Sequence, residues 1–382
     1  MSNRFLCCLG GGGSSKVMQD PSELPQQQQP SDSSDSSDTP GQQSEGDDEA
    51  DDEDPSSIVK FRWNDVVEGT DNFAITHLIG QGTYGKVYRC KFPEGHKVGA
   101  AKIHSNGITD GLSETVAETT TLYAADHPNV IKLVGKYYGM EKSVLVYEFM
   151  PNGSLDHHLF AHARQVQGLT LPTRVLDWNT RLRIAVGVAE GLVYVHQGLY
   201  AIHRDIKVEN ILLDKDFVPK LTDFGFATKI VYNSDGVERL REFNTRGTQG
   251  YIAPEADEFA LVSTKSDIYS YGVLLLVLLT GRKAYDLARP VAKEKLTDWL
   301  MPVWTRLEYA PMIVDVALGN KYSIEGLNKL LQTARMCINP QALERPAMDF
   351  VETMVREAAA FPVPKEPLVK ERISTSTSTY EV

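Results

Sequence analysis

The sequence is poor in cysteine and lacks any long hydrophobic run. Its 382 residues include four cysteines, which are Cys7, Cys8, Cys90 and Cys337. With no C-x-x-C pair or zinc-ligand spacing among them, a disulfide scaffold is excluded and a reducing, cytoplasmic compartment is expected. The longest aliphatic run, residues 273–279, is far shorter than the roughly 20 residues of a membrane-spanning helix. We therefore expect no transmembrane segment, and the short apolar stretch at residues 5–9 predicts no secretory signal.

An excess of one charge is absent from most of the chain. The net charge is -12, but residues 1–57 hold 13 acidic and 2 basic side chains, so the other 325 residues sum to -1. The body of the protein therefore has no net charge that would indicate binding to nucleic acid or to an acidic membrane. Hydrophobic residues make up 42% and charged residues 24%, as in ordinary soluble proteins.

The acidic residues define an N-terminal arm, residues 1–57. Ser, Gln, Asp, Glu and Pro account for 36 of the 44 residues from 14 to 57, with no aromatic residue. Such a segment cannot bury enough apolar surface to offset its ordering entropy, so we predict disorder. The sharper alternatives are a phosphorylated regulatory tract and a tail that recruits a basic partner. A Ser/Thr alternation predicts a second disordered tail at residues 360–382.

Adjacent cysteines lie near the start of the arm. Cys7 and Cys8 are flanked by apolar residues, a setting that favours S-acylation. Two acyl chains anchor a protein stably, whereas one does not. Residue 2 is Ser2 rather than glycine, so the N-myristoylation signal is missing. We predict Cys7 and Cys8 as lipidation sites that would tether the protein to the cytoplasmic face of the plasma membrane.

Three glycines follow an apolar segment in the order Gly80-Gln81-Gly82-Thr83-Tyr84-Gly85. Glycine permits positive φ and lets backbone amides approach phosphate groups. The same spacing also opens dinucleotide-binding units, but these continue into a helix. Residues 86–91 instead alternate with a period of two, as a strand does. The sequence therefore predicts a phosphate-binding loop within a β-hairpin.

A lysine ends the next apolar strand. Lys102 follows residues 98–101, and Glu118 lies in a stretch, residues 112–125, with helical spacing of apolar residues. An ion pair between this lysine and this glutamate would position the α and β phosphates of a nucleotide.

The most specific motif is His203-Arg204-Asp205, with Asn210 five residues after the aspartate. Asp223-Phe224-Gly225 follows 13 residues after Asn210. Together these two motifs match the signature set of protein kinases, and the chain resembles eukaryotic protein kinases over residues 73–359.

Further segments are similar to one plant family, the receptor-like/Pelle kinases. They are Asn72-Phe73 and residues 147–155, 176–182, 247–255 and 344–348. Without a transmembrane span, the chain resembles a receptor-like cytoplasmic kinase. This resemblance implies an upstream receptor kinase and protein substrates with Ser or Thr acceptors, and nothing in the sequence indicates an oligomeric state.

The resemblance implies a role for each motif residue. Asp205 would accept or orient the proton of the acceptor hydroxyl, and Lys207 would lie against the γ-phosphate of ATP. A lysine at this position is typical of Ser/Thr kinases. Asn210 and Asp223 would hold Mg²⁺, because both offer the hard oxygen ligands that this ion prefers. Lys102 and Glu118 complete the implied catalytic set.

The resemblance also implies an adenine site, with Tyr147 as its gatekeeper and the hinge at residues 148–150. The residues implied to bind ATP are Ile79, Gly80, Gln81, Gly82, Gly85, Val87, Ala100, Lys102, Glu148, Met150 and Leu212.

Further residues are expected to have structural or regulatory roles. Glu255 and Arg345 resemble the buried ion pair of kinase C-lobes, and we expect Asp267 to cap the helix that continues to residue 279. Arg204 would bind a phosphate on the activation segment. The phosphoacceptor candidates are Thr245, Thr248 and Ser234. Of these, Thr245 is preferred, since Thr248 resembles a position whose hydroxyl contacts the catalytic aspartate.

The predicted fold class is α+β, a bilobal kinase fold with a β-rich N-lobe to about residue 147 and a helical C-lobe from about residue 151. A lead-in segment, residues 58–72, precedes it. The first functional hypothesis is an ATP- and Mg²⁺-dependent Ser/Thr kinase. The alternative is a pseudokinase scaffold, but pseudokinases typically lack one of the catalytic residues that this chain retains.

Overall fold

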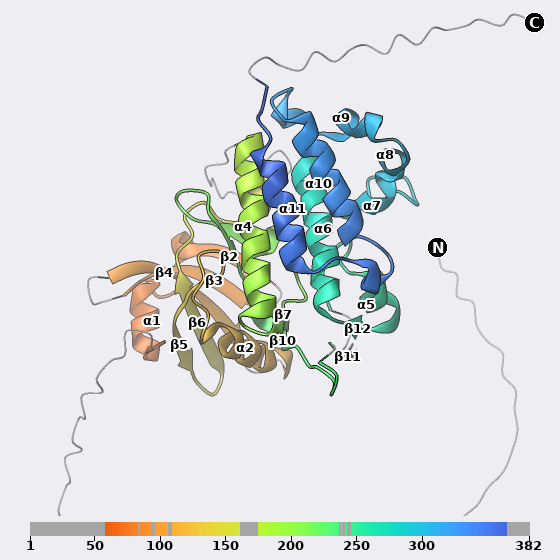
Figure 1. Cartoon of the computed structure of the whole chain (residues 1–382). Coiled ribbons are helices and arrows are strands. Elements are labelled where there is room, and N and C mark those ends of the chain that lie inside the picture. Colours follow the sequence, from red (N-terminus) through yellow and green to blue (C-terminus); the bar gives the residue numbers. More distant parts are fainter. Residues whose placement is uncertain are drawn as a thin grey trace, which may run out of the picture. The chain divides into compact units, whose positions relative to one another are not determined.

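The computed structural model describes residues 58–82, 85–92, 96–105, 109–160, 175–236, 238, 241–242 and 246–364. The acidic arm, Cys7, Cys8, Thr245 and the tail from residue 365 lie outside the described residues. Within the described ranges, the structure confirms the predicted fold class, with a β-sheet N-lobe and a helical C-lobe (Figure 1).

The N-lobe is a six-stranded sheet with the strand order β1-β5-β6-β4-β3-β2. All neighbouring strands are antiparallel except β1, which pairs in parallel with β5. Its elements are β1 (Val59–Lys60), α1 (Trp63–Gly69), β2 (Leu78–Gly82), β3 (Gly85–Phe92), β4 (His96–Ser105), α2 (Thr109–Leu122), β5 (Leu133–Tyr138) and β6 (Lys142–Glu148).

The C-lobe is built on four long helices that run side by side in Figure 1: α4 (Trp178–Gln197), α6 (Thr264–Thr280), α10 (Ile324–Cys337) and α11 (Met348–Ala360). Its shorter helices are α3 (Leu155–Leu159), α5 (Pro254–Phe259), α7 (Leu296–Trp299), α8 (Met301–Thr305) and α9 (Ala310–Ile313). Three short strand pairs complete the lobe: β7 (Ala201–Ile202) with β10 (Thr228–Lys229), β8 (Ile211–Leu213) with β9 (Pro219–Leu221), and β11 (Arg241–Glu242) with β12 (Leu261–Val262).

Helix α6 is the core of the C-lobe. Every residue from Ser266 to Thr280 is buried, as the apolar run predicts. The helix ends at Gly281, whose φ of 62° lies in the left-handed region, and a Cβ there would lie 2.4 Å from the Asp315 carboxylate. Glycine is therefore required at this C-terminus.

The expected cap of α6 is wrong. Ser263 is the N-cap, and it forms a capping box with Ser266. Asp267 lies inside the first turn, and its carboxylate accepts hydrogen bonds from the backbone N–H groups of His203 (2.7 Å) and Arg204 (2.8 Å). The carboxylate of Asp267 thus holds the loop that contains His203 and Arg204 rather than the end of its own helix.

Arg345 is buried, with 1% of its surface exposed, and is fully engaged by polar partners. Its guanidinium donates to both carboxylate oxygens of Glu255 at 2.7 and 2.8 Å. It also donates to the backbone carbonyl oxygens of Asn339 and Lys265. A buried cation is tolerated only when it is paired and hydrogen-bonded in this way, so this ion pair fixes α5 to the loop that precedes α11.

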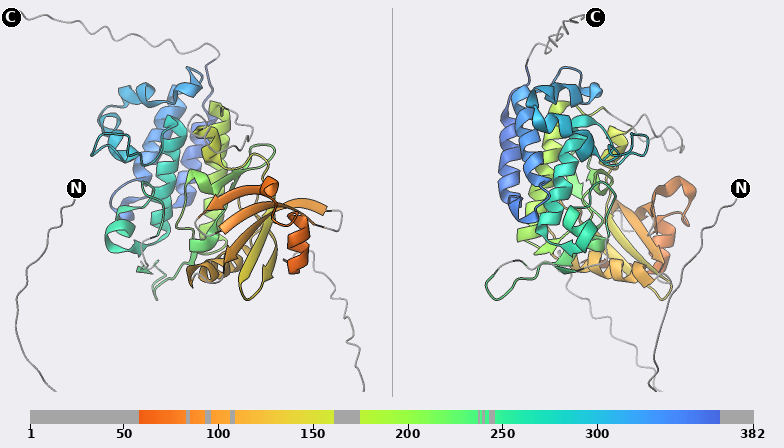
Figure 2. Two further views of the ribbon diagram at one scale, coloured as in Figure 1. Left: turned by 180° about the vertical axis from the view of Figure 1, so that it is seen from behind. Right: turned by 90° about the vertical axis from the view of Figure 1, so that its right-hand side faces the viewer.

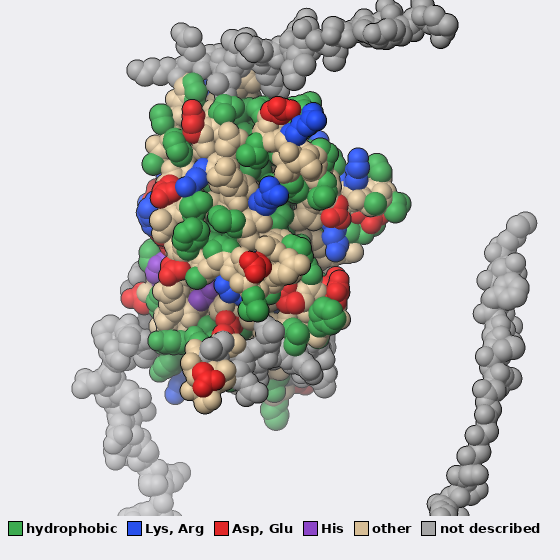
Figure 3. All heavy atoms as spheres, turned by 45° about the vertical axis from the view of Figure 1, so that its right-hand side comes forward, with side chains coloured by type: hydrophobic (Ala, Val, Ile, Leu, Met, Phe, Trp, Pro, Cys, Tyr) green, Lys and Arg blue, Asp and Glu red, His purple; other side chains and the backbone are tan. Residues whose placement is uncertain are grey.

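Both signs of charge alternate with apolar and other polar side chains on the face drawn in Figure 3. This mixture accords with the near-zero net charge of the 325 residues that follow the arm.

The lead-in segment, residues 58–72, contributes strand β1 to the N-lobe sheet and helix α1, which packs against it. The ring of Phe61 stacks on Phe92 at a centroid distance of 4.2 Å. Trp63 lies 5.4 Å from Phe73 and 5.5 Å from Tyr137. Helix α1 packs against β3 and lies beside the sheet in each view of Figures 1 and 2. The N-lobe therefore begins at β1, ahead of the glycine loop.

We predict that Phe61→Ala lowers the free energy of unfolding by about 2 kcal/mol, because it removes a partly buried aromatic ring from its stack. Gly135→Ala is expected to act on the same contact, since a Cβ there would lie 2.2 Å from the Phe61 ring. Urea denaturation of the full chain measures both changes. Ile75→Ala is the control, because Ile75 is 78% exposed and should change stability by less than about 0.5 kcal/mol. Wild-type stability in both test variants would contradict this role of the lead-in segment.

Candidate active site

Lys102 joins three elements that are distant in the sequence. Its Nζ donates to Glu118 Oε2 on α2 at 3.0 Å and to Asp223 Oδ1 at 2.7 Å. Burial alone would lower the pKa of Lys102, but the two carboxylates raise it overall. The pKa of Asp223 is lowered, since the attraction of Lys102 outweighs the effect of burial. The lysine is therefore held as a cation and the aspartate as an anion.

Helix α2 also contacts the backbone beside Asp223. The N–H of Phe224, which begins the 3₁₀ turn η4 (Phe224–Phe226), donates to Glu118 Oε1 at 3.3 Å. Glu118 is fully buried, so both of its oxygens are engaged away from water. One glutamate thus fixes the strand lysine and the turn that follows Asp223 with respect to one another.

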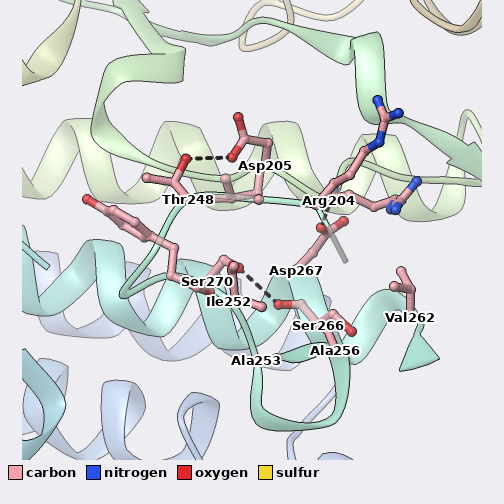
Figure 4. Close-up of a pocket in the computed structure, with 14 residues that line it drawn as sticks. Arg204, Asp205, Thr248, Ile252, Ala253, Ala256, Val262, Ser266, Asp267 and Ser270 are labelled. Atoms are coloured by element: carbon pink, nitrogen blue, oxygen red, sulfur yellow. Dashed lines mark hydrogen bonds between the residues drawn. The ribbon is translucent and has the colours of Figure 1, made fainter. Parts of the chain in front are cut away.

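The Asp205 carboxylate accepts hydrogen bonds on both of its oxygens. Oδ2 accepts from Lys207 Nζ at 2.6 Å and from Asn210 Nδ2 at 2.9 Å. Oδ1 accepts from the Thr248 hydroxyl at 2.9 Å, and Figure 4 shows this hydroxyl pointing toward Asp205. Lys207 Nζ also donates to Thr248 Oγ1 at 2.8 Å. The arrangement holds one carboxylate in a single orientation beside a cationic ammonium group.

Asn210 ends the 3₁₀ turn η3 (Val208–Asn210) next to the strand that leads to Asp223. Its Nδ2 donates to the backbone oxygen and the carboxylate of Asp205 at 2.8 and 2.9 Å. The Asn210 amide oxygen is therefore left as an acceptor. The backbone N–H of Thr222 donates to the Asn210 carbonyl at 3.1 Å, which brings Asp223 to this loop. Carboxylate and amide oxygens suit Mg²⁺, which takes few protein ligands when phosphates supply the others.

No metal-binding cluster of three or more His, Cys, Asp or Glu side chains occurs in the part of the chain that the structure describes. An ion held by Asp223 and Asn210 would complete its coordination with oxygens of water or of a bound nucleotide.

The glycine segment forms the predicted hairpin. Strands β2 and β3 are antiparallel, with Gln81 opposite Lys86 and Gly82 opposite Gly85. Gly85 has a φ of 152°, and a Cβ there would lie 2.0 Å from the Ile103 carbonyl oxygen. A side chain at this position would push β3 away from β4, so the close approach of these strands requires glycine.

The residues implied to contact adenine come from both lobes. Ile79, Val87 and Ala100 lie on β2, β3 and β4, and Leu212 lies on β8 of the C-lobe, all of them partly exposed. Tyr147 is buried at the end of β6, where burial and the nearby Glu118 carboxylate raise its pKa well above the ordinary value. The Glu148 side chain accepts from the backbone N–H of Lys132 and pairs with Lys220, each at 2.9 Å. These contacts fix Glu148, the first residue of the implied hinge. Met150, two positions later, is buried.

Of the activation-segment candidates, the structure describes Ser234 and Thr248. Ser234 is exposed in a turn, whereas the Thr248 hydroxyl is bonded to Asp205. Arg204 donates to the carbonyl oxygen of Phe226 at 3.2 Å. A cavity beside the activation segment is lined by Arg204, Asp205, Arg246, Tyr251 and Ile252, among others (Figure 4).

Sequence reasoning missed three residues around this site: Glu114, Arg246 and His104. Glu114 on α2 forms an ion pair with Arg246 at 3.0 Å. Its spacing of four residues from Glu118 is a signal, because such residues share one face of a helix. His104 follows Lys102 by two residues on β4, which places the two side chains on one face of the sheet.

His104 is fully buried, and neither of its ring nitrogens has a hydrogen-bond partner among the described residues. Burial, together with the positive charge of Lys102, lowers the pKa of His104 to about 3. The ring is therefore neutral in the folded protein at physiological pH, whereas in the unfolded chain it would titrate near pH 6.5.

The low pKa of His104 predicts a specific pH dependence of stability. Between about pH 6.5 and pH 3 the unfolded state binds a proton that the folded state does not, so stability falls as the pH falls. From pH 7 to pH 5 this group should lower the free energy of unfolding by about 2 kcal/mol. We predict that His104→Leu flattens the dependence by that amount and gains about 1 kcal/mol at pH 7 by removing an unsatisfied polar ring. Urea denaturation at both pH values measures this, and an unchanged pH slope in the variant would refute it.

The described ranges contain no helix that combines the length and the hydrophobicity needed to cross a lipid bilayer.

The two-lobed fold, in which Lys102, Asp205 and Asp223 lie on facing elements, is that of a phosphotransferase.

Comparison with known proteins identifies the family. The protein kinase domain model matches residues 73–358. The probable serine/threonine-protein kinase PBL5 of Arabidopsis thaliana is 38% identical over 294 residues, which cover 76% of this chain and 67% of the relative. The probable serine/threonine-protein kinase PBL23 of the same plant is 35% identical over 301 residues, covering 78% of this chain and 76% of the relative. The leucine-rich repeat receptor protein kinase EMS1, also from A. thaliana, is 40% identical over 301 residues, which cover 76% of this chain but 24% of that receptor.

The chain therefore belongs to the protein kinase family, among serine/threonine kinases similar to plant PBL and receptor-like kinases. Members of this family use ATP and a divalent metal ion.

Proposed function

We propose that the protein is an active serine/threonine kinase that transfers the γ-phosphate of ATP to Ser or Thr hydroxyls of protein substrates. The observation that carries this proposal is the Lys102 ammonium, which contacts Glu118 and Asp223 at the same time. A scaffold that only binds nucleotide could use the same lysine, so the retained proton acceptor Asp205, held by Lys207, Asn210 and Thr248, distinguishes an active kinase from it. The complete set of Lys102, Glu118, Asp205, Asn210 and Asp223 supports the active reading over the pseudokinase alternative.

The geometry around Asp205 suits activation of an acceptor hydroxyl. The acceptor oxygen forms a bond to the γ-phosphorus as the bond from phosphorus to the β–γ bridging oxygen breaks and ADP leaves, while the hydroxyl proton passes to the Asp205 carboxylate. Lys207, 2.6 Å from that carboxylate, provides positive charge where the transferred group carries negative charge. Thr248 and Asn210 keep the carboxylate in one orientation throughout.

Lys102 is proposed to bind the α and β phosphates, and Glu118 holds its ammonium in place. Asp223 and Asn210 would hold a divalent ion, proposed to be Mg²⁺, whose positive charge would neutralise the phosphates. The Gly80–Gly85 hairpin is proposed to cover the phosphates. The partly exposed apolar residues Val87, Ala100 and Leu212 are proposed to contact adenine.

The decisive test is autophosphorylation of the full chain with Mg²⁺-ATP, beside the Asp205→Asn variant. We expect phosphate on Ser or Thr in the wild type and a loss of about 10²- to 10⁴-fold in rate in the variant, because the proton acceptor is removed. Asp216→Asn is the control, since that aspartate is exposed on a loop and, among the described residues, its carboxylate pairs only with the neighbouring Lys215. Mass spectrometry would map the sites, and Thr245 is the proposed main acceptor, with Ser234 as the second candidate.

A folded wild-type protein that transfers no phosphate to itself or to a protein acceptor, even after an upstream receptor kinase has phosphorylated it, would contradict the proposal. A thermal shift on adding ATP would then favour the scaffold alternative.

We also propose that acylation of Cys7 and Cys8 tethers the kinase to the cytoplasmic face of the plasma membrane, where a receptor kinase would act on it. Two acyl chains give stable anchoring, whereas one gives reversible binding. In cells, the wild type should incorporate hydroxylamine-sensitive palmitate and fractionate with membranes, and Cys7→Ser/Cys8→Ser should lose both. The single variants should show intermediate membrane retention. Equal palmitate labelling of the double variant and the wild type would disprove the assignment.

A further inference from the structure

An ion pair connects α2 to the activation segment. Arg246 Nη1 lies 3.0 Å from Glu114 Oε1, and the side chain of Glu114 is only 4% exposed. A buried carboxylate is strongly destabilised when it loses a counter-charge, whereas an intact buried pair with good geometry is tolerated. The position of α2 is therefore coupled to the position of Arg246.

Glu114 lies one helical turn before Glu118. The two side chains share the inner face of α2, and the Cβ of Glu114 would lie 3.3 Å from a Cβ on Gly225. The opposite face of α2 exposes Leu112 and Val116, at 47% and 51%. Because the helix is held along its inner face, contacts on that face decide whether Glu118 reaches Lys102.

Arg246 contacts the turn that follows Asp223. Its guanidinium lies 5.2 Å from the centroid of the Phe226 ring, and Arg204 donates to the carbonyl oxygen of the same residue at 3.2 Å. Two residues after Arg246, the Thr248 hydroxyl donates to Asp205. A continuous series of contacts thus runs from α2 through Arg246 to the carboxylate that would receive the acceptor proton.

We propose that Glu114 and Arg246 are positioning residues that couple the two halves of the active site. Their ion pair holds α2 where Glu118 bonds Lys102, and it holds the Arg246–Thr248 segment where Thr248 bonds Asp205. Nucleotide binding in the N-lobe and acceptor binding at Asp205 thereby support one another. This inference rests on the proposed kinase function.

A double-mutant cycle in the full chain tests the coupling. The variants are Glu114→Gln, Arg246→Gln and the two together, and the measured quantities are the dissociation constant of Mg²⁺-ATP and kcat for phosphorylation of a generic Ser/Thr protein acceptor. Each single variant should weaken Mg²⁺-ATP binding and lower kcat. The ratio of kcat to the dissociation constant should fall about 10-fold. The double variant should lose about as much as Arg246→Gln alone, because that single variant has already broken the ion pair with Glu114.

Two further variants separate positioning from loss of stability. Arg246→Lys keeps the charge and should retain more binding than Arg246→Gln, since an ammonium still attracts the buried carboxylate although the planar contact with the Phe226 ring is lost. Asp315→Asn breaks the buried Arg181–Asp315 pair in the C-lobe. It should lower the melting temperature, yet leave the dissociation constant of the folded protein unchanged, since neither residue lies near α2.

The inference is overturned if the two single losses multiply to about 100-fold in the double variant, or if the Glu114 and Arg246 variants change the melting temperature alone. The binding arm of the cycle does not need phosphoryl transfer. A wild type that binds Mg²⁺-ATP but transfers no phosphate would therefore refute the proposed function, while the cycle still decides the coupling. A wild type that binds no Mg²⁺-ATP would overturn both.

Discussion

The carboxylate of Asp267 lies at the base of α6 and accepts three hydrogen bonds, from the backbone N–H groups of His203 and Arg204 and from His196 Nε2 at 2.9 Å. Burial alone would raise the pKa of Asp267, but the bonds and charges of the two histidines lower it overall. Arg204 adopts a φ of 73°, a conformation that is costly for a residue with a side chain. The buried carboxylate offsets that cost by accepting hydrogen bonds from the N–H groups of His203 and of Arg204 itself. The backbone that leads into Asp205 is thereby fixed.

From this anchor the active site is assembled by a small number of charged contacts between lobes. Lys102 arrives from a strand, Glu118 from α2 and Asp223 from the segment after β9, and the three meet within hydrogen-bonding distance. The rigid C-lobe, with α6 at its core, presents Asp205 and Asn210. Helix α2 is the less constrained partner, since one of its faces is exposed. The C-lobe side of the site is therefore fixed by its core, whereas the position of α2 depends on a few ion pairs.

The sequence was most informative where chemistry is local. Asp205, Lys207 and Asn210 lie within six residues, so their convergence follows from a single loop, and the β-hairpin of the glycine segment follows from alternation. The cap of α6 was misassigned because Asp267 is a common capping residue type, whereas the actual cap, Ser263, lies one turn earlier with Ser266 completing its capping box. Apart from the Glu255–Arg345 ion pair, which the family resemblance implied, contacts between residues distant in the sequence gave little signal. Glu114 and Arg246 are 132 residues apart, and His104 occupies an ordinary strand position whose lack of a polar partner depends on the side chains packed around it.

The close approach of β3 and β4 at Gly85 affects how inactive alleles of this gene should be interpreted. A side chain at Gly85 would collide with the Ile103 carbonyl oxygen at 2.0 Å before any nucleotide is considered. Loss of activity in an allele at this position would result from damage to the sheet that carries Lys102. Such an allele is therefore not equivalent to a kinase that is folded but catalytically inactive. A phenotype shared by alleles at Gly85 and Asp205 would identify a requirement for phosphoryl transfer, whereas one unique to Gly85 would identify a requirement for the folded lobe as a binding surface.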